Sequence, residues 1–158
     1  MPQRALASDG CQLAALDAAC FEPRERWSEQ LWADELAASD RLVVVQRDAG
    51  DLVAAATFQQ VADMVDLHRV MVHPTRRGLG LALQLVAAGA EWAQPRGAER
   101  MLLEVRHDNT PALGLYERLG FTRIDRRPDY YGPGAHAEVM QADLPLRPAP
   151  HTAGGSHE

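Results

Sequence analysis

A strand, a helix and a second strand follow one another in the middle of the chain, and this order limits the folds open to it. Residues 66–73 have the apolar pattern of a strand that Pro74 ends. The Ala- and Leu-rich residues 77–94 predict a long helix, and residues 100–106 predict a further strand. Two strands joined by a crossover helix lie parallel in one sheet. We therefore expect an α/β protein whose mixed sheet has parallel strands in its middle.

Further elements are expected on both sides of this unit. Ser28 is placed to cap a helix that starts after it. The others are a helix at 10–20, strands at 41–47 and 52–60 that form a hairpin, a helix at 109–119, and strands at 121–127 and 137–144. This pattern of elements predicts about six to seven strands and about four helices in one domain, residues 1–144. The Pro-, Gly- and Ser-rich residues 145–158 predict a disordered tail.

Composition excludes several classes of function. The 158 residues include 16 basic and 22 acidic ones, for a net charge of −6, whereas a general nucleic-acid binder needs a basic surface. No apolar run approaches the roughly 18 residues of a membrane span, and the first residues do not resemble a signal peptide. Cys11 and Cys20 would lie about 13 Å apart on one helix, too far for a disulfide. The histidines are scattered, so we expect no metal site. Together with the acidic charge and the lack of an apolar span or signal peptide, this predicts a cytoplasmic protein without nucleic-acid or membrane partners.

The turn that leads into the long helix has the composition of a phosphate-binding loop. Arg77-Gly78-Leu79-Gly80-Leu81-Ala82 places two glycines where the helix begins. Glycine lets the backbone approach a ligand, and the N–H groups of a helix N-terminus attract a pyrophosphate. The motif is neither a P-loop nor a G-x-G-x-x-G fingerprint, and on the glycines alone an ordinary turn is equally expected. Arg76 and Arg77 either neutralise phosphate or form a solvated helix start.

In its context this turn resembles the acetyl-CoA signature of the GNAT N-acetyltransferase superfamily. The family pattern Gln/Arg-x-x-Gly-x-Gly/Ala is met by Arg77, Gly80 and Ala82. The second half of the same fold is matched by Leu103-Glu104-Val105-Arg106, Asn109, Ala112, Leu115-Tyr116 and Gly120-Phe121. The resemblance implies a GNAT fold with a centrally splayed sheet. It also implies an acyltransferase that uses acetyl-CoA as co-substrate and needs no metal.

The resemblance further implies which residues hold acetyl-CoA. The strand at 70–72 presents backbone groups to the pantetheine amides, and we expect the N–H of Val72 to stabilise the thioester oxyanion. Asn109 is placed to cap its helix, and by resemblance it also contacts the pantetheine arm. The full predicted set is Val70, Met71, Val72, Arg77, Gly78, Leu79, Gly80, Leu81, Ala82, Asn109, Ala112 and Leu115.

Glu104 and Tyr116 are the candidates for proton transfer. The acceptor amine must be neutral, and an α-amine, with a pKa of about 8 against about 10.4 for Lys, needs only a modest base. Glu104 lies in an otherwise apolar strand, and the resemblance makes it that base; the alternative is a Glu on the solvent face that pairs with Arg106. Tyr116 belongs to an apolar helical stripe, which by itself predicts core packing. The resemblance makes it the proton donor to the leaving thiolate.

Within the superfamily the likeness is greatest to RimI-type protein N-terminal acetyltransferases, which implies a protein α-amine as the acceptor. The matching features include Trp27-Ser28 and, after Arg127, the pair Tyr130-Tyr131. They make Trp27, Tyr130 and Tyr131 the predicted substrate-binding residues, as walls of a peptide groove.

Two alternatives to a protein acceptor stay open. Ala135-His136 stand where RimI-type enzymes usually have an acidic pair, which favours a small amine such as an aminoglycoside, a polyamine or an amino acid. The second alternative is an acyl-CoA-binding module without catalysis. The presence of Glu104 and Tyr116 argues against this alternative. The chain is expected to be either a monomer or a homodimer.

Overall fold

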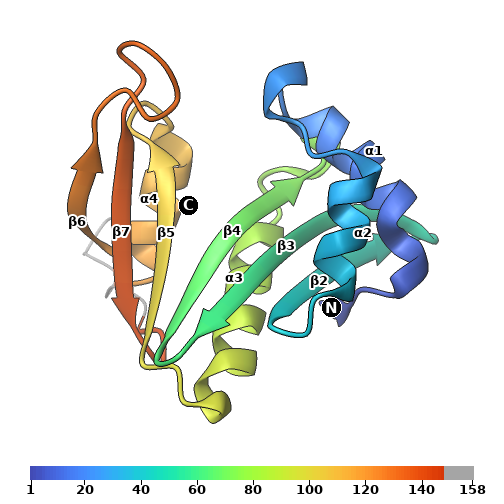
Figure 1. Cartoon of the computed structure of the whole chain (residues 1–158), viewed down its shortest axis with the longest axis horizontal. Coiled ribbons are helices and arrows are strands. Elements are labelled where there is room, and N and C mark those ends of the chain that lie inside the picture. Colours follow the sequence, from blue (N-terminus) through green and yellow to red (C-terminus); the bar gives the residue numbers. More distant parts are fainter. Residues whose placement is uncertain (148–158) are drawn as a thin grey trace.

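The computed structural model describes residues 1–147, which form a mixed seven-stranded sheet with helices on both faces (Figure 1). The strands are β1 Gln3–Arg4, β2 Arg41–Asp48, β3 Asp51–Val61, β4 Met64–Val72, β5 Arg100–Arg106, β6 Thr122–Arg127 and β7 Ala137–Asp143, in the order β1-β2-β3-β4-β5-β7-β6. The helices are α1 Gly10–Cys20, α2 Glu29–Ala37, α3 Leu81–Ala93 and α4 Thr110–Arg118. The predicted fold class is confirmed.

The sheet splits at its centre, between β4 and β5. These strands are parallel, as the crossover through α3 requires, but they pair only from Met64–Arg100 to Leu67–Leu103. Beyond that pair the two strands diverge, and Figure 1 shows them forming the two arms of a V. All other neighbouring strands are antiparallel. The predicted central splay is therefore present.

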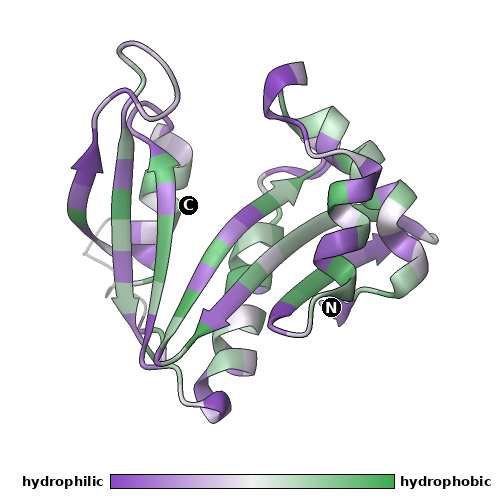
Figure 2. Ribbon diagram, viewed as in Figure 1, coloured by the Kyte–Doolittle hydropathy of each residue, from purple (hydrophilic) through white to green (hydrophobic). Residues whose placement is uncertain are grey.

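Helices cover the two faces of the sheet unequally. Helices α3 and α4 pack on one face, where the main core contains Phe58, Leu85 and Met140. On the other face α1 and α2 cover the first strands through a second core that contains Leu13 and Trp32. Within residues 1–147, no helix covers that second face over β5, β7 and β6 (Figure 1). Hydrophilic residues accordingly interrupt the hydrophobic ones along β5 and β7, as Figure 2 shows.

Gly89 allows α3 to lie close to the sheet. A Cβ atom at this position would stand 2.3 Å from the ring of Phe58, so any larger residue would push the helix away. The fully buried Phe58 and the small residue above it therefore set the height of α3 over β3.

Apart from shifts of one or two residues at the ends of strands and helices, the structure departs from the predictions in three places. The predicted helix 77–94 begins only at Leu81, because Gly78 and Gly80 take positive φ values and interrupt the helical path. The short β1, which pairs with β2, was missed because two residues carry no periodicity. Of the predicted tail, residues 145–147 are described and Leu146 packs against the main core, whereas 148–158 lie outside the described residues.

Other local predictions are confirmed. Ser28 caps α2, where its Oγ accepts a hydrogen bond from the N–H of Leu31 at 3.1 Å. The bounds of α1 and β5 are those predicted. No helix within residues 1–147 is both long and apolar enough to cross a bilayer.

Candidate active site

The divergence of β4 and β5 opens a cleft of about 1850 Å³. Of the predicted site residues, only Leu79 lies outside its lining, with its side chain turned to solvent. The lining brings together Trp27, Val70, Met71, Val72, Arg77, Gly78, Gly80, Leu81, Ala82, Glu104, Asn109, Ala112, Leu115, Tyr116, Tyr130 and Tyr131. The cleft thus joins residues from both halves of the sheet and from α3 and α4.

A glycine turn closes one end of the cleft. Gly78 and Gly80 have φ values of +82° and +78°, and no atom lies within 4 Å of where a Cβ would stand on either. The turn therefore leaves free space at the N-terminus of the 13-residue helix α3, whose first N–H groups have no helical partner. Arg77 lies beside it, and Arg118 at the end of α4, which sequence reasoning missed, lines the same cleft. Arg76 instead pairs with Asp48.

The free edge of β4 follows this turn into the cleft. The N–H of His73 bonds to the carbonyl of Val53, toward β3, at 2.8 Å. Successive residues of a strand point their N–H and C=O groups to opposite edges, so those of Val70 and Val72 point away from β3, into the splay. In agreement, the Val72 carbonyl accepts hydrogen bonds from Nε of Arg77 at 3.2 Å and from Sγ of Cys20 at 3.4 Å. The N–H groups of Val70 and Val72 are thus directed to the cleft.

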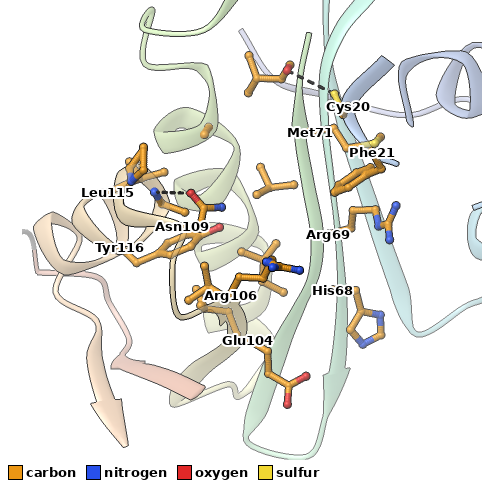
Figure 3. Close-up of a pocket in the computed structure, with 18 of the residues that line it drawn as sticks. Cys20, Phe21, His68, Arg69, Met71, Glu104, Arg106, Asn109, Leu115 and Tyr116 are labelled. Carbon is orange, nitrogen blue, oxygen red and sulfur yellow. Dashed lines mark hydrogen bonds between the residues drawn. The ribbon is translucent and has the colours of Figure 1, made fainter. Parts of the chain in front are cut away.

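Helix α4 contributes Asn109 and Tyr116 to the same side. Asn109 caps the helix, with Oδ1 accepting a hydrogen bond from the N–H of Ala112 at 3.3 Å (Figure 3). Tyr116 is buried and its ring packs edge-on against Phe121, 5.7 Å between centroids. Burial raises the pKa of the Tyr116 phenol above its usual value. The hydroxyl therefore stays protonated at neutral pH and is available as a hydrogen-bond donor.

Glu104 has a different partner from the one considered in the sequence. Its Oε2 lies 2.9 Å from Nη1 of Arg127 on β6, and its side chain is 30% exposed. Arg106 pairs instead with Asp108, just after β5. Because no described helix covers this face of β5, β7 and β6, the Arg127 side chain reaches Glu104 across β7. Glu104 thus lies partly exposed in the cleft, with its carboxylate paired to an arginine from β6.

Aromatic residues form two walls of the cleft, one around Trp27 and one around Tyr130 and Tyr131. The ring of Trp27 packs at a tilt against Trp32, with 4.9 Å between centroids, and the rings of Tyr130 and Tyr131 meet edge-on at 5.0 Å. Tyr130 is half exposed, whereas burial raises the pKa of Tyr131 to about 12, with a smaller contribution from the charge of Glu104. The two walls come from the segment before α2 and from the loop between β6 and β7.

A buried ion pair that the sequence reasoning missed supports the first of these walls. Asp17 of α1 is fully buried and accepts hydrogen bonds from Nη1 of Arg69 at 2.8 Å, the N–H of Trp27 at 3.1 Å and the indole of Trp32 at 3.2 Å. The Arg69 guanidinium lies over the ring of Phe21 at 4.0 Å and over that of Trp27 at 4.6 Å. The signal in the sequence was an acid on the apolar face of a helix, which implies a buried partner.

The cleft has two sides, which Figure 3 separates. Tyr116, Asn109 and Leu115 lie on one side of β4, and Phe21, Arg69 and His68 lie on the other. The first side has the glycine turn, the free strand edge and α4, a set suited to an extended ligand with a phosphate end. The second side has aromatic walls and paired charges, which suits a polar chain end.

Both the sequence and the fold of this chain are similar to those of known proteins. The model of the acetyltransferase (GNAT) family matches residues 11–121. The chain is 32% identical over 141 residues to the N-alpha-acetyltransferase RimI of Mycobacterium tuberculosis, covering 86% of this chain and 87% of that protein. An uncharacterised protein of Mycobacterium leprae is also 32% identical over 141 residues, which are 86% of this chain and 38% of that longer protein. The crystal structure of the ribosomal-protein-S18-alanine N-acetyltransferase of Escherichia coli matches with a TM-score of 0.81 and 25% identity, covering 91% of this chain and 93% of that one.

Proposed function

Because this chain belongs to the acetyltransferase (GNAT) family, we propose that it transfers the acetyl group of acetyl-CoA to the α-amino group of a protein N-terminus. The observation that carries the proposal is the β4–β5 cleft, with the glycine turn at one end and Glu104 and Tyr116 along it. The protein acceptor is supported by the RimI relative, an N-alpha-acetyltransferase that matches nearly the whole chain.

The residues of the cleft fit acetyl-CoA. Acetyl-CoA supplies an activated thioester, and its pyrophosphate needs N–H donors and close backbone approach, which the turn at Gly78 and Gly80 offers. The N–H groups of Val70 and Val72 lie on the free edge of β4, where a pantetheine amide can pair as an added strand does. The N–H of Val72 is the proposed donor to the thioester oxygen.

Glu104 and Tyr116 have distinct proposed roles. Glu104 accepts a proton from the amine nitrogen, as the family resemblance implies, with Arg127 holding its carboxylate in place. Tyr116 donates a hydrogen bond to the leaving thiolate. Because a CoA thiol has a pKa of about 8.5 and burial raises that of Tyr116 above its usual 10, complete proton transfer from the phenol is uphill. The thiolate then takes its proton from solvent.

The acceptor side suits a peptide end. Trp27 on one wall and Tyr130 and Tyr131 on the other supply flat, amphipathic surfaces for a backbone. A small amine is the second candidate, favoured by the acidic pair that is missing at Ala135-His136. Nδ1 of His136 accepts a hydrogen bond from the N–H of Asp129 at 3.0 Å, so the His136 side chain stabilises the loop between β6 and β7.

An acceptor panel with acetyl-CoA, read by mass spectrometry, tests the proposal. It contains peptides with free N-termini, the same peptides blocked at the N-terminus but bearing Lys, polyamines and aminoglycosides. We expect acetylation of the free peptide N-termini alone. Acetylation of the small amines alone would contradict the protein acceptor and support the second candidate.

A further inference from the structure

A β-bulge turns His68 toward the second side of the cleft, where Phe21 and Arg69 also lie. In the β3–β4 pairing Thr57 opposes Arg69 and Phe58 opposes Leu67, so His68 has no partner in β3. An extra residue of this kind re-aims side chains, and here it directs two consecutive ones to the same face. Arg69 contacts Asp17 of α1 and His68 approaches Glu35 of α2, helices that cover one face, and Figure 3 shows both side chains on one side of β4.

A carboxylate stands behind the imidazole of His68. Oε2 of Glu35 is 3.8 Å from Nδ1 of His68 and accepts the hydroxyl hydrogen bond of Thr57, while Oε1 is 3.3 Å from Nε of Arg41. Burial acts to raise the pKa of Glu35, but contacts with His68 and Thr57 and the charge of Arg41 outweigh it and hold that pKa below its usual value. Glu35, only 11% exposed, is therefore a firmly held anion close to the imidazole.

His68 and Glu104 stand at corresponding places where the splay begins. The last β4–β5 pair is Leu67–Leu103, and His68 and Glu104 are the next residues on the two strands. Leu67 and Leu103 belong to the core under α3 and α4, so the following residue of β5 points to the opposite face, as the bulge residue of β4 does. Both side chains line the cleft.

The other charged groups near His68 are already paired or lie apart from its ring. Arg69, next to it on β4, is held by Asp17 from α1. Arg41 from β2 contacts Glu35, and Asp66 is the neighbouring acid on β4. Across the splay on β5, Glu104 pairs with Arg127. Glu35 is the carboxylate that faces the imidazole directly, and the His68 side chain is 29% exposed.

We propose that His68, with the Glu35 carboxylate beside its ring, takes the proton of the acceptor ammonium, as a second proton acceptor opposite Glu104. This inference rests on the proposed acetyl transfer to an α-amine. The nitrogen must lose two protons: one as ammonium before attack, and one as the N–C bond forms and the C–S bond breaks. His68 accepts the first and Glu104 the second. The thiolate takes one proton from solvent, so one proton is released in all.

The test compares two acceptors, of which only one must lose a proton before it can attack the thioester. One is a short peptide that begins with alanine; the other is the same peptide with an aminooxyacetyl group at its N-terminus, whose amine is already neutral at pH 7. The variants are His68→Gln and Glu35→Gln, with Glu29→Gln, exposed on the same helix, as matched control. The kcat is measured at pH 7 with saturating acetyl-CoA, after subtraction of the reaction without enzyme.

For His68→Gln we expect kcat on the alanyl peptide to fall by about 100-fold, the low end for a general base. Glu35→Gln should follow with a smaller fall, and both variants should keep their activity on the aminooxy peptide, which also shows that they fold. Equal losses on the two acceptors, or no loss on either, would overturn the role of His68 while leaving the proposed function intact. Failure of the unmodified enzyme to acetylate either peptide would overturn both.

Discussion

The two sides of the cleft are built in different ways. The donor side consists mainly of backbone from short segments, 70–72 and 77–82, which are adjacent in sequence. The acceptor side consists of side chains from distant segments, among them Trp27, Arg69 and Tyr131, held by contacts such as Asp17–Arg69. Any residue offers an N–H group, so the donor side depends on conformation, whereas the acceptor side depends on which side chains meet. Substitutions should therefore affect the two sides separately.

Replacement of Asp17 by Ala should damage the acceptor side alone and has the largest expected effect. It leaves the Arg69 guanidinium without its carboxylate inside the protein, and breaking a buried ion pair costs about 3–5 kcal/mol. We expect urea denaturation to show a loss of about 3 kcal/mol in the free energy of unfolding. The KM for a peptide should rise while the Kd for acetyl-CoA stays the same. Asp34→Ala, on the exposed face of α2, is the control, and parallel weakening of both ligands would refute the separation.

Gly80→Asp should damage the donor side alone. Asp tolerates the left-handed conformation that Gly80 adopts, so the fold is kept, but its charge repels a pyrophosphate at the start of α3. Calorimetry should show acetyl-CoA binding weakened roughly 100-fold, about 2.7 kcal/mol. Gly97→Asp is the matched control, because Gly97 also has a positive φ and open space around it but lies outside the cleft lining. Unchanged affinity in Gly80→Asp would remove the phosphates from this turn.

Tyr116→Phe should slow the chemical step without weakening the binding of either substrate. The ring stays packed against Phe121 and only the hydroxyl is lost. If the phenol donates a hydrogen bond and no proton, kcat should fall by about tenfold, or about 1.4 kcal/mol, without a change in either KM. A fall of several hundredfold, with an unchanged melting temperature, would instead indicate complete proton transfer from Tyr116.

The smallest expected effect is the contribution of Glu35 to acid stability. Because the pKa of Glu35 is lower in the folded than in the unfolded chain, its charge stabilises the fold above the unfolded value of about 4.5. This contribution is lost as the pH falls through the folded pKa. In Glu35→Gln the free energy of unfolding should thus decline less between about pH 5 and pH 3 than in the unmodified protein. An equal decline in the two proteins would contradict the lowered pKa; Glu29→Gln serves as the control.

Much of the fold was predictable because the signals were local. The bounds of α1 and β5 follow from apolar periodicity, and the cap at Ser28 from residue type. Periodicity failed at the start of α3, since a repeating Ala/Leu pattern does not reveal the positive φ of Gly78 and Gly80. It failed equally for the bulge at His68, because a change of register depends on how two strands pair.

The sequence by itself determined the order of strands and helices, the parallel centre of the sheet and the glycine turn. Each of these depends on residues close together along the chain. Only the tertiary structure decided which charges pair: Glu104 with Arg127 and not Arg106, Asp17 with Arg69, and Glu35 beside His68. The physical reason is that strand register and helix packing choose the partner of a side chain among elements far apart in sequence, and hydrophobic periodicity records which face is buried but not what that face meets.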